Sequence, residues 1–400
     1  MKFLILAFPF FLVFSCSENP GAINAKEIAQ NVIIVDSHID VPFRLWNQHL
    51  EGLEIDDISG STEGDFDFIR ARKGGLNVPF FSIYLPASTQ NEGVSHKMAN
   101  ELIDLVEDIV TLHSDKFFLI KSTQDINKLK SRDVVGIALG MENGAPIEGD
   151  LSRVQYYFDR GIRYITLTHS KTNHISDSSY DDNIQWQGLS KFGIDLIGEM
   201  NRVGIMIDVS HVSDKAFYQA IEISEVPVIA SHSSLRYFTP GFERNVGDEM
   251  LRKLAEKGGV LMINFGSSFI SQRSRNYSIK MEEYLKEKFS EGRSNLSQEI
   301  IEEARKQFSF KNEYPFATLG EVLDHFDRVI TIAGINHVGI GSDYDGVGNT
   351  LPIGLKDVSS YPNLIQGLLD RGYSQIDIEK ILGGNFMRVW KEVEEYASQH

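Results

Sequence analysis

The chain has 400 residues, of which 42% are hydrophobic and 24% are charged, the composition of a soluble globular protein with a sizeable core. Its 39 basic and 56 acidic side chains give a formal net charge of −17 at pH 7. Such an acidic surface repels phosphate backbones, so we expect no nucleic acid among its partners.

The N-terminus has the layout of a secretory signal. A short positive start precedes an apolar run over residues 3–14, and the single cysteine, Cys16, follows. The run is too short to span a bilayer, and Cys16 lies where a bacterial lipoprotein signal is cut and lipidated. We therefore expect a signal peptide over residues 1–16, a tether over 17–30, and an exported cell-envelope lipoprotein, periplasmic or on the surface, anchored to a membrane through Cys16. The alternative is an ordinary signal peptide with an incidental cysteine.

Beyond the tether, short apolar runs alternate with amphipathic helical patterns. The runs that predict buried strands are residues 31–40, 77–85, 134–143, 162–169, 205–211, 227–232, 259–265 and 337–346. Helical spacing of apolar residues, as in residues 97–112 and 189–204, predicts helices between most of them, whereas residues 45–75 are expected to form a polar loop. The alternation favours one α/β domain over residues 31–398, a (β/α)8 TIM-type barrel rather than an open doubly wound sheet.

A charged insert separates the seventh and eighth predicted strands. It covers about residues 266–325 and contains two stretches with helical patterns, MEEYLKEKF and SQEIIEEARKQF. Long inserts in compact domains are often functional. A lid or an oligomer contact is therefore one interpretation, and a solvated pair of surface helices is the other.

Polar side chains follow most of the predicted strands. They are His38 and Asp40 on the first strand, Glu142 on the third, His169 on the fourth, His211 on the fifth, His232 on the sixth and Asp343 on the eighth. In a (β/α)8 barrel the chemistry takes place at these C-terminal strand ends. A lone histidine is usually structural, but histidines repeated along one rim indicate metal ligands. Because side chains alternate along a strand, His38 and Asp40 should face the same way.

These ligands are too many for a single zinc ion that keeps an open position. A pair of metal ions about 3.5–4 Å apart can be coordinated by all of these ligands, because one carboxylate can bridge such a pair. Glu142 lies on a strand between the two ligand groups and is the predicted bridge. His38 and Asp40 would then hold one ion, and His211 and His232 the other.

Seven motifs carry a resemblance to a known family. In chain order they read SHID, GMENG, ITLTHS, DVSHVS, ASHSS, RNV and GSDYDG. Together, over roughly residues 32–390, they resemble the membrane dipeptidase (renal dipeptidase) family, which belongs to the amidohydrolase-type zinc barrels. A single motif of this length is weak evidence, but seven in order on the expected strands are strong evidence.

The resemblance implies a role for each site residue. Two zinc ions per chain, bridged by Glu142, would hold a hydroxide that attacks the peptide bond of a dipeptide. His169 would contact the scissile carbonyl or the developing oxyanion, Arg244 would bind the substrate's terminal carboxylate, and Asp343 would transfer the proton. The family also implies tolerance of a C-terminal D-residue, and it favours a homodimer. The loop after His169 reads NHISDSS, with less aromatic character than the family leads us to expect, which leaves substrate preference open.

Two other functions stay open at this point. The same metals could serve another binuclear amidohydrolase, acting on N-acyl amino acids, cyclic amides or lactones. A lipoprotein that binds peptides without turnover is the second alternative, and it should have lost a metal ligand or Asp343. The sequence retains them all.

Overall fold

The computed structural model describes residues 24–129, 133–289 and 298–400, so the expected signal peptide and Cys16 lie outside the described residues. Within them, eight parallel strands close into the predicted barrel: β1 (Ile34–Ile39), β2 (Leu76–Tyr84), β4 (Val135–Glu142), β5 (Ile162–Thr166), β6 (Met206–Asp208), β7 (Ile229–Ser233), β8 (Val260–Ile263) and β9 (Val338–Ile340). Successive barrel strands are neighbours, and the ring closes because β9 pairs with β1 and β2 pairs with β4.

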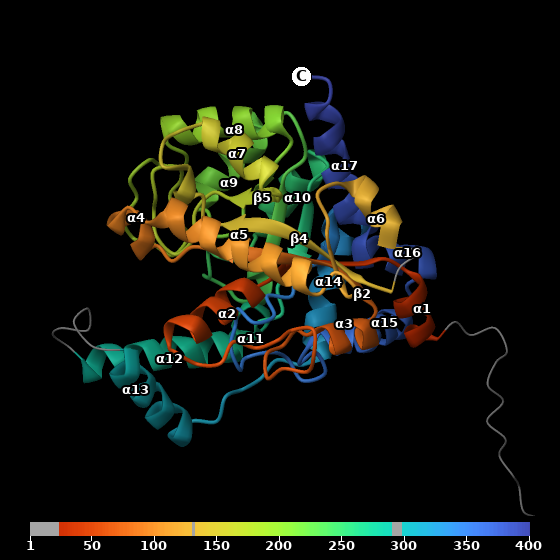
Figure 1. The fold of residues 1–400 in the computed structure, drawn as a ribbon. Coiled ribbons are helices and arrows are strands. Elements are labelled where there is room, and N and C mark those ends of the chain that lie inside the picture. Colours follow the sequence, from red (N-terminus) through yellow and green to blue (C-terminus); the bar gives the residue numbers. More distant parts are fainter. Residues whose placement is uncertain (1–23, 130–132, 290–297) are drawn as a thin grey trace, which may run out of the picture.

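Helices surround the barrel (Figure 1). They are α1 (Ala25–Asn31), α2 (Val41–Leu50), α3 (Phe68–Gly74), α4 (Ser88–Glu92), α5 (Ser95–Leu112), α6 (Thr123–Leu129), α7 (Ser152–Asp159), α8 (Lys191–Val203), α9 (Asp214–Ile223), α10 (Asp248–Glu256), α11 (Ser267–Ile270), α12 (Gln272–Lys288), α13 (Gln298–Lys311), α14 (Leu319–Ala333), α15 (Tyr361–Asp370), α16 (Gln375–Glu379) and α17 (Asn385–Ala397). Shorter turns lie at η1 (Ala145–Ile147), η2 (Arg236–Phe238), η4 (Ile335–His337), η5 (Val358–Ser360) and the π turn η6 (Lys380–Gly384). None of the helices in the described ranges is long and apolar enough to cross a membrane.

Local sequence signals explain where several helices begin and end. Ser213 caps α9, because its side chain accepts a hydrogen bond from the backbone N–H of Ala216. Helix α8 ends at Gly204, whose φ of 91° is the left-handed conformation that glycine adopts without steric cost.

The segment expected to be a polar loop over residues 45–75 instead contains most of α2 and all of α3. Helix α2 begins directly after Asp40, carries Pro42 in its first turn and buries Val41 and Leu45. Helix α3 is capped by Asp67, whose side chain accepts from the N–H of Arg70. Helix α1 lies partly in the expected tether and is anchored by buried apolar residues. These helices are short, so the spacing of their few apolar residues carries little signal.

One strand was missed, β3 (Phe117–Leu119), which pairs with the beginning of β4 outside the ring. It is only three residues long, too short for a recognisable pattern. Its absence from the prediction does not alter the barrel.

The interior of the barrel is filled by a layer of aromatic and aliphatic side chains. Phe80 lies 5.7 Å from Tyr164, 5.0 Å from Phe386 and 5.3 Å from Trp390 between ring centroids. Because Phe386 and Trp390 belong to α17, the C-terminal helix closes the N-terminal end of the ring. The opposite end, where the strands terminate, is left for polar side chains.

The insert between β8 and β9 contains the two predicted helices, α12 and α13. Figure 1 shows α12 running below α2 as a continuation of α11 (Ser267–Ile270), with α13 at the outer edge of the molecule. Aromatic side chains hold the pair together, with the ring of Tyr277 5.2 Å from that of Phe308. The insert therefore packs as a unit of its own on the rim of the barrel.

Candidate active site

The predicted site residues converge on one cavity at the C-terminal end of the barrel strands. The cavity has a volume of ≈ 1150 Å³. The predicted residues that line it are Asp40, Glu142, His169, His211, His232, Arg244 and Asp343. His38 is fully buried beneath them and contacts Asp40 and Glu142. The structure therefore brings together every residue that the sequence placed at the site.

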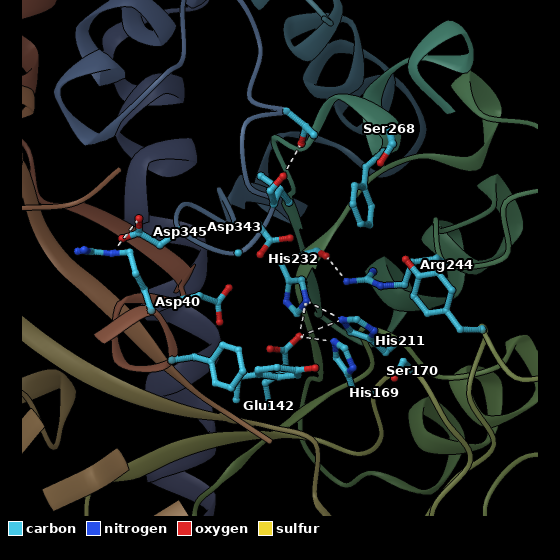
Figure 2. A pocket seen from close by; sticks show the side chains of 18 of the residues that line it. Asp40, Glu142, His169, Ser170, His211, His232, Arg244, Ser268, Asp343 and Asp345 are labelled. Atoms are coloured by element: carbon cyan, nitrogen blue, oxygen red, sulfur yellow. Dashed lines mark hydrogen bonds and ion pairs between the residues drawn. The ribbon is translucent and has the colours of Figure 1, made fainter. Parts of the chain in front are cut away.

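Glu142, the last residue of β4, lies at the centre of the histidine cluster (Figure 2). Its Oε1 is 3.4 Å from Nε2 of His169, 3.0 Å from Nε2 of His211 and 3.2 Å from Nε2 of His232. Its Oε2 is turned the other way, 3.5 Å from Nε2 of His38. The two carboxylate oxygens thus face different histidines, as a bridging ligand requires.

His38 reaches the cavity through an irregularity in β1. Val35 belongs to the interior cluster with Phe80, so strict alternation along the strand would direct His38 outward. A register shift between Asp36 and Ile39 turns the ring inward instead, where it lies 6.4 Å from that of Tyr164. His38 and Asp40 do face the same point, as predicted, and their side chains meet at 3.5 Å. The cause is the register shift and not regular alternation along the strand.

Hydrogen bonds fix the orientation and tautomer of His38. The Tyr164 hydroxyl donates to the backbone carbonyl of Ser37 at 3.0 Å. It has no second hydrogen, so in its 2.8 Å bond with His38 it accepts from Nδ1–H. This bond leaves the lone pair of Nε2 directed at the cavity.

A similar chain of hydrogen bonds orients His232. The Ser231 hydroxyl donates to Oδ2 of Asp208 at 2.6 Å, so it accepts from Nδ1–H of His232 at 2.7 Å. Nε2 of His232 therefore also points into the site with its lone pair. Partners that fix the tautomer of a ligating histidine in this way are typical of metal sites.

The donor set fits two metal ions. Three groups each bring three ligand atoms within 4.8 Å of one another: His38, Glu142 and His232; Glu142, His169 and His211; and His38, Asp40 and Asp343. Ligands about 2.0–2.1 Å from a tetrahedral zinc ion lie about 3.3 Å from each other, close to the separations around Glu142. Nε2 of His38 and Oδ1 of Asp40 are buried without a hydrogen-bond partner in the structure, which leaves them available to a cation.

The electrostatics of Glu142 and His211 agree with this assignment, whereas the pKa of His38 lies well above its usual value, because the charges of Tyr164, Asp40 and Glu142 outweigh the effect of burial. Burial alone would raise the pKa of Glu142, but the neighbouring histidines hold it well below its usual value. Burial, with the nearby charge of Arg244, lowers the pKa of His211 well below its usual value. Neutral imidazoles and an ionised carboxylate are the forms that bind a metal.

Asp343 lies across the cavity from Glu142, just after β9. Its Oδ2 accepts a hydrogen bond of 2.6 Å from the side-chain amide of Asn264. Burial and the nearby carboxylate of Asp40 raise the pKa of Asp343 to about 8, a range suited to a group that gains and loses a proton near neutral pH. The backbone φ values of Asp343 (63°) and His211 (69°) are both positive, and such strain is concentrated at functional sites.

Arg244 is a buried cation beside the metal ligands. It is only 3% exposed, and its guanidinium donates to the Ser233 hydroxyl at 2.5 Å and to the carbonyl of His232 at 2.7 Å. Across the described ranges, no carboxylate forms an ion pair with it, and its Nε lacks a hydrogen-bond partner. A buried positive charge without a counter-ion is suited to an anionic group of a ligand.

Hydrogen bonds hold the loop after His169 to two predicted site residues. The Ser178 hydroxyl donates to the carbonyl of His169 at 2.5 Å, and the N–H of Ser179 donates to the carbonyl of His211 at 2.8 Å. This arrangement places Tyr180 on the cavity wall, 5.9 Å from the ring of His211. The loop thus supplies an aromatic wall residue that its sequence, NHISDSS, did not suggest.

Sequence reasoning also missed residues that hydrogen-bond to the predicted site residues or to their partners. They are Tyr164, Asp208, Ser231 and Asn264. Asp208 and Ser231 belong to the recognised motifs DVSHVS and ASHSS, which was the available signal. Nothing in the sequence indicates that Tyr164, deep in the barrel, lies beneath His38.

Two further histidines, His337 and His325, have partners away from the cavity. His337 bonds through Nδ1 to the carbonyl of Gly259 at 2.7 Å. His325 accepts from the N–H of Leu235 at 3.1 Å and bonds through Nε2 to the carbonyl of Ile270 at 3.0 Å. Neither lines the cavity.

Comparison with known proteins assigns the family. The model of the membrane dipeptidases (Peptidase family M19) matches residues 23–400. The chain belongs to the membrane dipeptidase family. Like its family, it is a metal-dependent hydrolase of the dipeptidase type. The resemblance seen in the seven motifs is thereby confirmed.

Individual relatives agree with the family assignment. An uncharacterized dipeptidase of Schizosaccharomyces pombe is 32% identical over 388 residues, which cover 94% of this chain and 83% of that one. The crystal structure of the probable dipeptidase PvdM from Pseudomonas aeruginosa superimposes with a TM-score of 0.80 at 27% identity, covering 93% of this chain and 98% of that one. A metallopeptidase of Rhodobacter sphaeroides, liganded with a phosphinate mimic of L-Ala-D-Ala, shares the fold at a TM-score of 0.73 and 21% identity, over 90% of this dipeptidase and 99% of that chain.

Replacing Ser231 by Ala should weaken metal binding at His232. The variant removes the hydroxyl that accepts from His232 Nδ1 and donates to Asp208, and loss of such a partner typically lowers metal affinity by about 10–100-fold. Zinc titration against a competing chelator measures the effect. Ser234→Ala is the matched control, because the buried Ser234 hydroxyl donates to the carbonyl of Asn264 and touches no ligand. Equal zinc affinity in the two variants would contradict the prediction.

Proposed function

We propose that the chain hydrolyses the peptide bond of dipeptides with two zinc ions bridged by Glu142. The observation that supports this proposal best is the position of the Glu142 carboxylate, with one oxygen near His38 and the other near His211 and His232. His38 and Asp40 would hold one ion, and His211 and His232 the other. The bound ions would supply a hydroxide nucleophile near neutral pH and polarise the scissile carbonyl.

Arg244 would set the length of the substrate. Its buried guanidinium presents a planar fork that matches a carboxylate, and it lies within the same cavity as Glu142. A free carboxylate held there fixes the C-terminal end of the substrate at a constant distance from the metal ligands. Dipeptides satisfy this arrangement better than long chains do.

His169 and Asp343 would carry out the remaining steps. Burial lowers the pKa of His169, so a neutral ring would donate one hydrogen bond to the carbonyl oxygen as negative charge develops on it. Asp343 would accept the proton of the attacking water on its carboxylate and deliver it to the leaving amine nitrogen. The hydrogen bond from Asn264 would keep the Asp343 carboxylate in place during both transfers.

The N-terminal segment gives the proposed location. A lipid on Cys16 would anchor the enzyme at a membrane of the bacterial cell envelope, and residues 17–23 would separate the anchor from the first helix. A homodimer is proposed from family membership alone. Neither proposal affects the chemistry of the site.

The decisive experiment measures amino-acid release from dipeptides by the chain produced without residues 1–16. L-Ala-L-Ala tests hydrolysis of an ordinary dipeptide. L-Ala-D-Ala tests tolerance of a C-terminal D-residue, and it has the stereochemistry of the mimic bound by the Rhodobacter sphaeroides relative. Chelation should abolish cleavage, and two equivalents of zinc should restore it. The C-terminal amide of L-Ala-L-Ala should be a poor substrate, because it cannot form an ion pair with Arg244.

The same panel should include N-acyl amino acids, cyclic amides and lactones. Zinc binding with turnover only of these compounds would replace the dipeptidase proposal by another amidohydrolase activity. Zinc binding without any turnover would favour a peptide-binding lipoprotein. Failure to bind zinc would refute the metal assignment.

A further inference from the structure

A second cavity adjoins the active site on the side of the insert. Its volume is ≈ 470 Å³, and it lies between α12, α13 and the segments 314–316 and 349–350. We call it the insert pocket. Glu282, Arg305 and Thr350 line both this pocket and the active-site cavity. The two spaces are therefore neighbours that share one rim.

The walls of the insert pocket are mainly apolar and aromatic. Tyr277, Met281, Leu285, Tyr314 and Phe316 form most of the wall, and the small polar residues Ser278, Ser309 and Asn349 complete it. The charged residues of the pocket, Glu282 and Arg305, lie at the shared rim. A mainly apolar space with a polar entrance favours a ligand group that is mainly apolar.

Packing contacts hold these walls in place. The ring of Tyr277 lies 4.9 Å from that of Tyr314, which in turn lies 4.9 Å from the ring of Phe316. The hydroxyl of Tyr277 donates to the Ser309 hydroxyl at 3.0 Å, so it is bonded within the wall. A pocket with such walls is preformed, and a ligand group that enters it loses little affinity to rearrangement.

The active-site cavity alone is already large for a small substrate. Its ≈ 1150 Å³ exceeds the range of about 300–1000 Å³ that suits drug-sized ligands, and a dipeptide of small residues is smaller than these. The cavity extends from the metal ligands to Glu282 on α12 and Arg305 on α13. Substrate atoms beyond the scissile bond can therefore reach the insert.

We propose that the insert pocket binds a large apolar side chain of the dipeptide substrate and so sets specificity. This inference rests on the proposed dipeptidase function and names the substrate class of that site. Aromatic and long aliphatic side chains are the groups that fill such a space. The side chain belongs to either the first or the second residue, and the substrates below distinguish the two.

The test fills the pocket from α12. Ser278→Trp and Met281→Trp each place a large ring into it, one turn apart. Ile279→Trp is the matched control, because Ile279 lies on the same helix, is 39% exposed and lines neither cavity. Circular dichroism and zinc content of all three variants show that the fold and the metal site are intact.

The substrates are L-Ala-L-Ala, L-Trp-L-Ala and L-Ala-L-Trp, compared by kcat/KM with the zinc-loaded enzyme. The wild type should prefer one tryptophan dipeptide to L-Ala-L-Ala by about tenfold or more, since apolar contacts of this size discriminate by such factors. Both pocket-filling variants should lose that preference and keep L-Ala-L-Ala turnover within about twofold, and Ile279→Trp should behave as wild type.

Three results would overturn the inference. They are a wild type without the size preference, pocket variants indistinguishable from Ile279→Trp, and equal losses for all three substrates. A wild type that cleaves no dipeptide would overturn the proposed function as well. Cleavage without the size preference overturns the role of the insert pocket alone.

Discussion

Replacing Asp343 by Asn is expected to lower kcat by about 10²–10⁴-fold and to leave the zinc content unchanged. The size of the loss is that of a positioned general acid–base group. Asparagine has the same shape, and its side-chain oxygen can still accept the hydrogen bond from Asn264. The variant therefore removes the proton-transferring group without opening a cavity. Single-turnover kinetics and metal analysis on the same preparation measure both quantities.

Two outcomes would contradict this role for Asp343. Near-normal turnover would remove the residue from proton transfer. Loss of one zinc ion would make it a ligand, a role that its proximity to the ligand atoms of His38 and Asp40 allows. Turnover and metal content together therefore separate the two assignments.

Asp345 provides the matched control. Its carboxylate accepts from the N–H of Asp65 at 2.7 Å and pairs with Arg44 at 3.2 Å, and its own N–H donates to Asp65 at 2.8 Å. These contacts hold the loop after β9. Asp345→Asn should lower the melting temperature and keep kcat of the folded, zinc-loaded enzyme within a few-fold.

The sequence predicts this site well where one rule of barrel architecture decides the position. Barrel strands are buried on both faces and appear as apolar runs, so the residue that ends each run lies at the C-terminal rim. This rule places Glu142 at the end of β4 and His232 near the end of β7, as the structure confirms. It needs no knowledge of how distant segments pack.

Features that depend on irregular backbone or on distant contacts could not be predicted. The bulge that turns His38 into the barrel follows from the pairing of β1 with β2, and a pattern of residue types does not reveal such a shift. The positive φ values of His211 and Asp343 are equally invisible, because neither residue is glycine. Tyr164 orients His38 across 126 positions of sequence. Each of these features arises only once the ring has closed.

The insert shows the same limit of sequence-based prediction, because its pocket depends on contacts between distant segments. Its charged helical pattern predicts α12 and α13 correctly, but it does not show which faces meet. The insert pocket depends on Tyr277 of α12 packing against Tyr314, 37 positions later. The pattern therefore locates the helices and leaves the pocket between them undetermined.

Gly346, in the motif GSDYDG, is expected to be as intolerant of change as a ligand. A Cβ atom built there would overlap Oδ2 of Asp40 and Oδ1 of Asp343. Its backbone does not have a positive φ, so alanine would suit the conformation and only the collision matters. Asp40 and Asp343 would have to move apart, and a displacement of about 1 Å in a catalytic group can lower the rate about a hundredfold.

Gly346→Ala should therefore lower kcat/KM by at least about a hundredfold and lower the affinity for the zinc ion proposed to bind Asp40. The melting temperature of the metal-free protein should change little. Gly198→Ala is the control, because a Cβ there meets nothing within 4 Å and alanine favours the helix α8 around it. Activity in Gly346→Ala comparable to the control would mean that the carboxylates of Asp40 and Asp343 can move away from residue 346 without loss of function. Their present positions would then not be the catalytic ones, and the arrangement proposed around Asp343 would have to be revised.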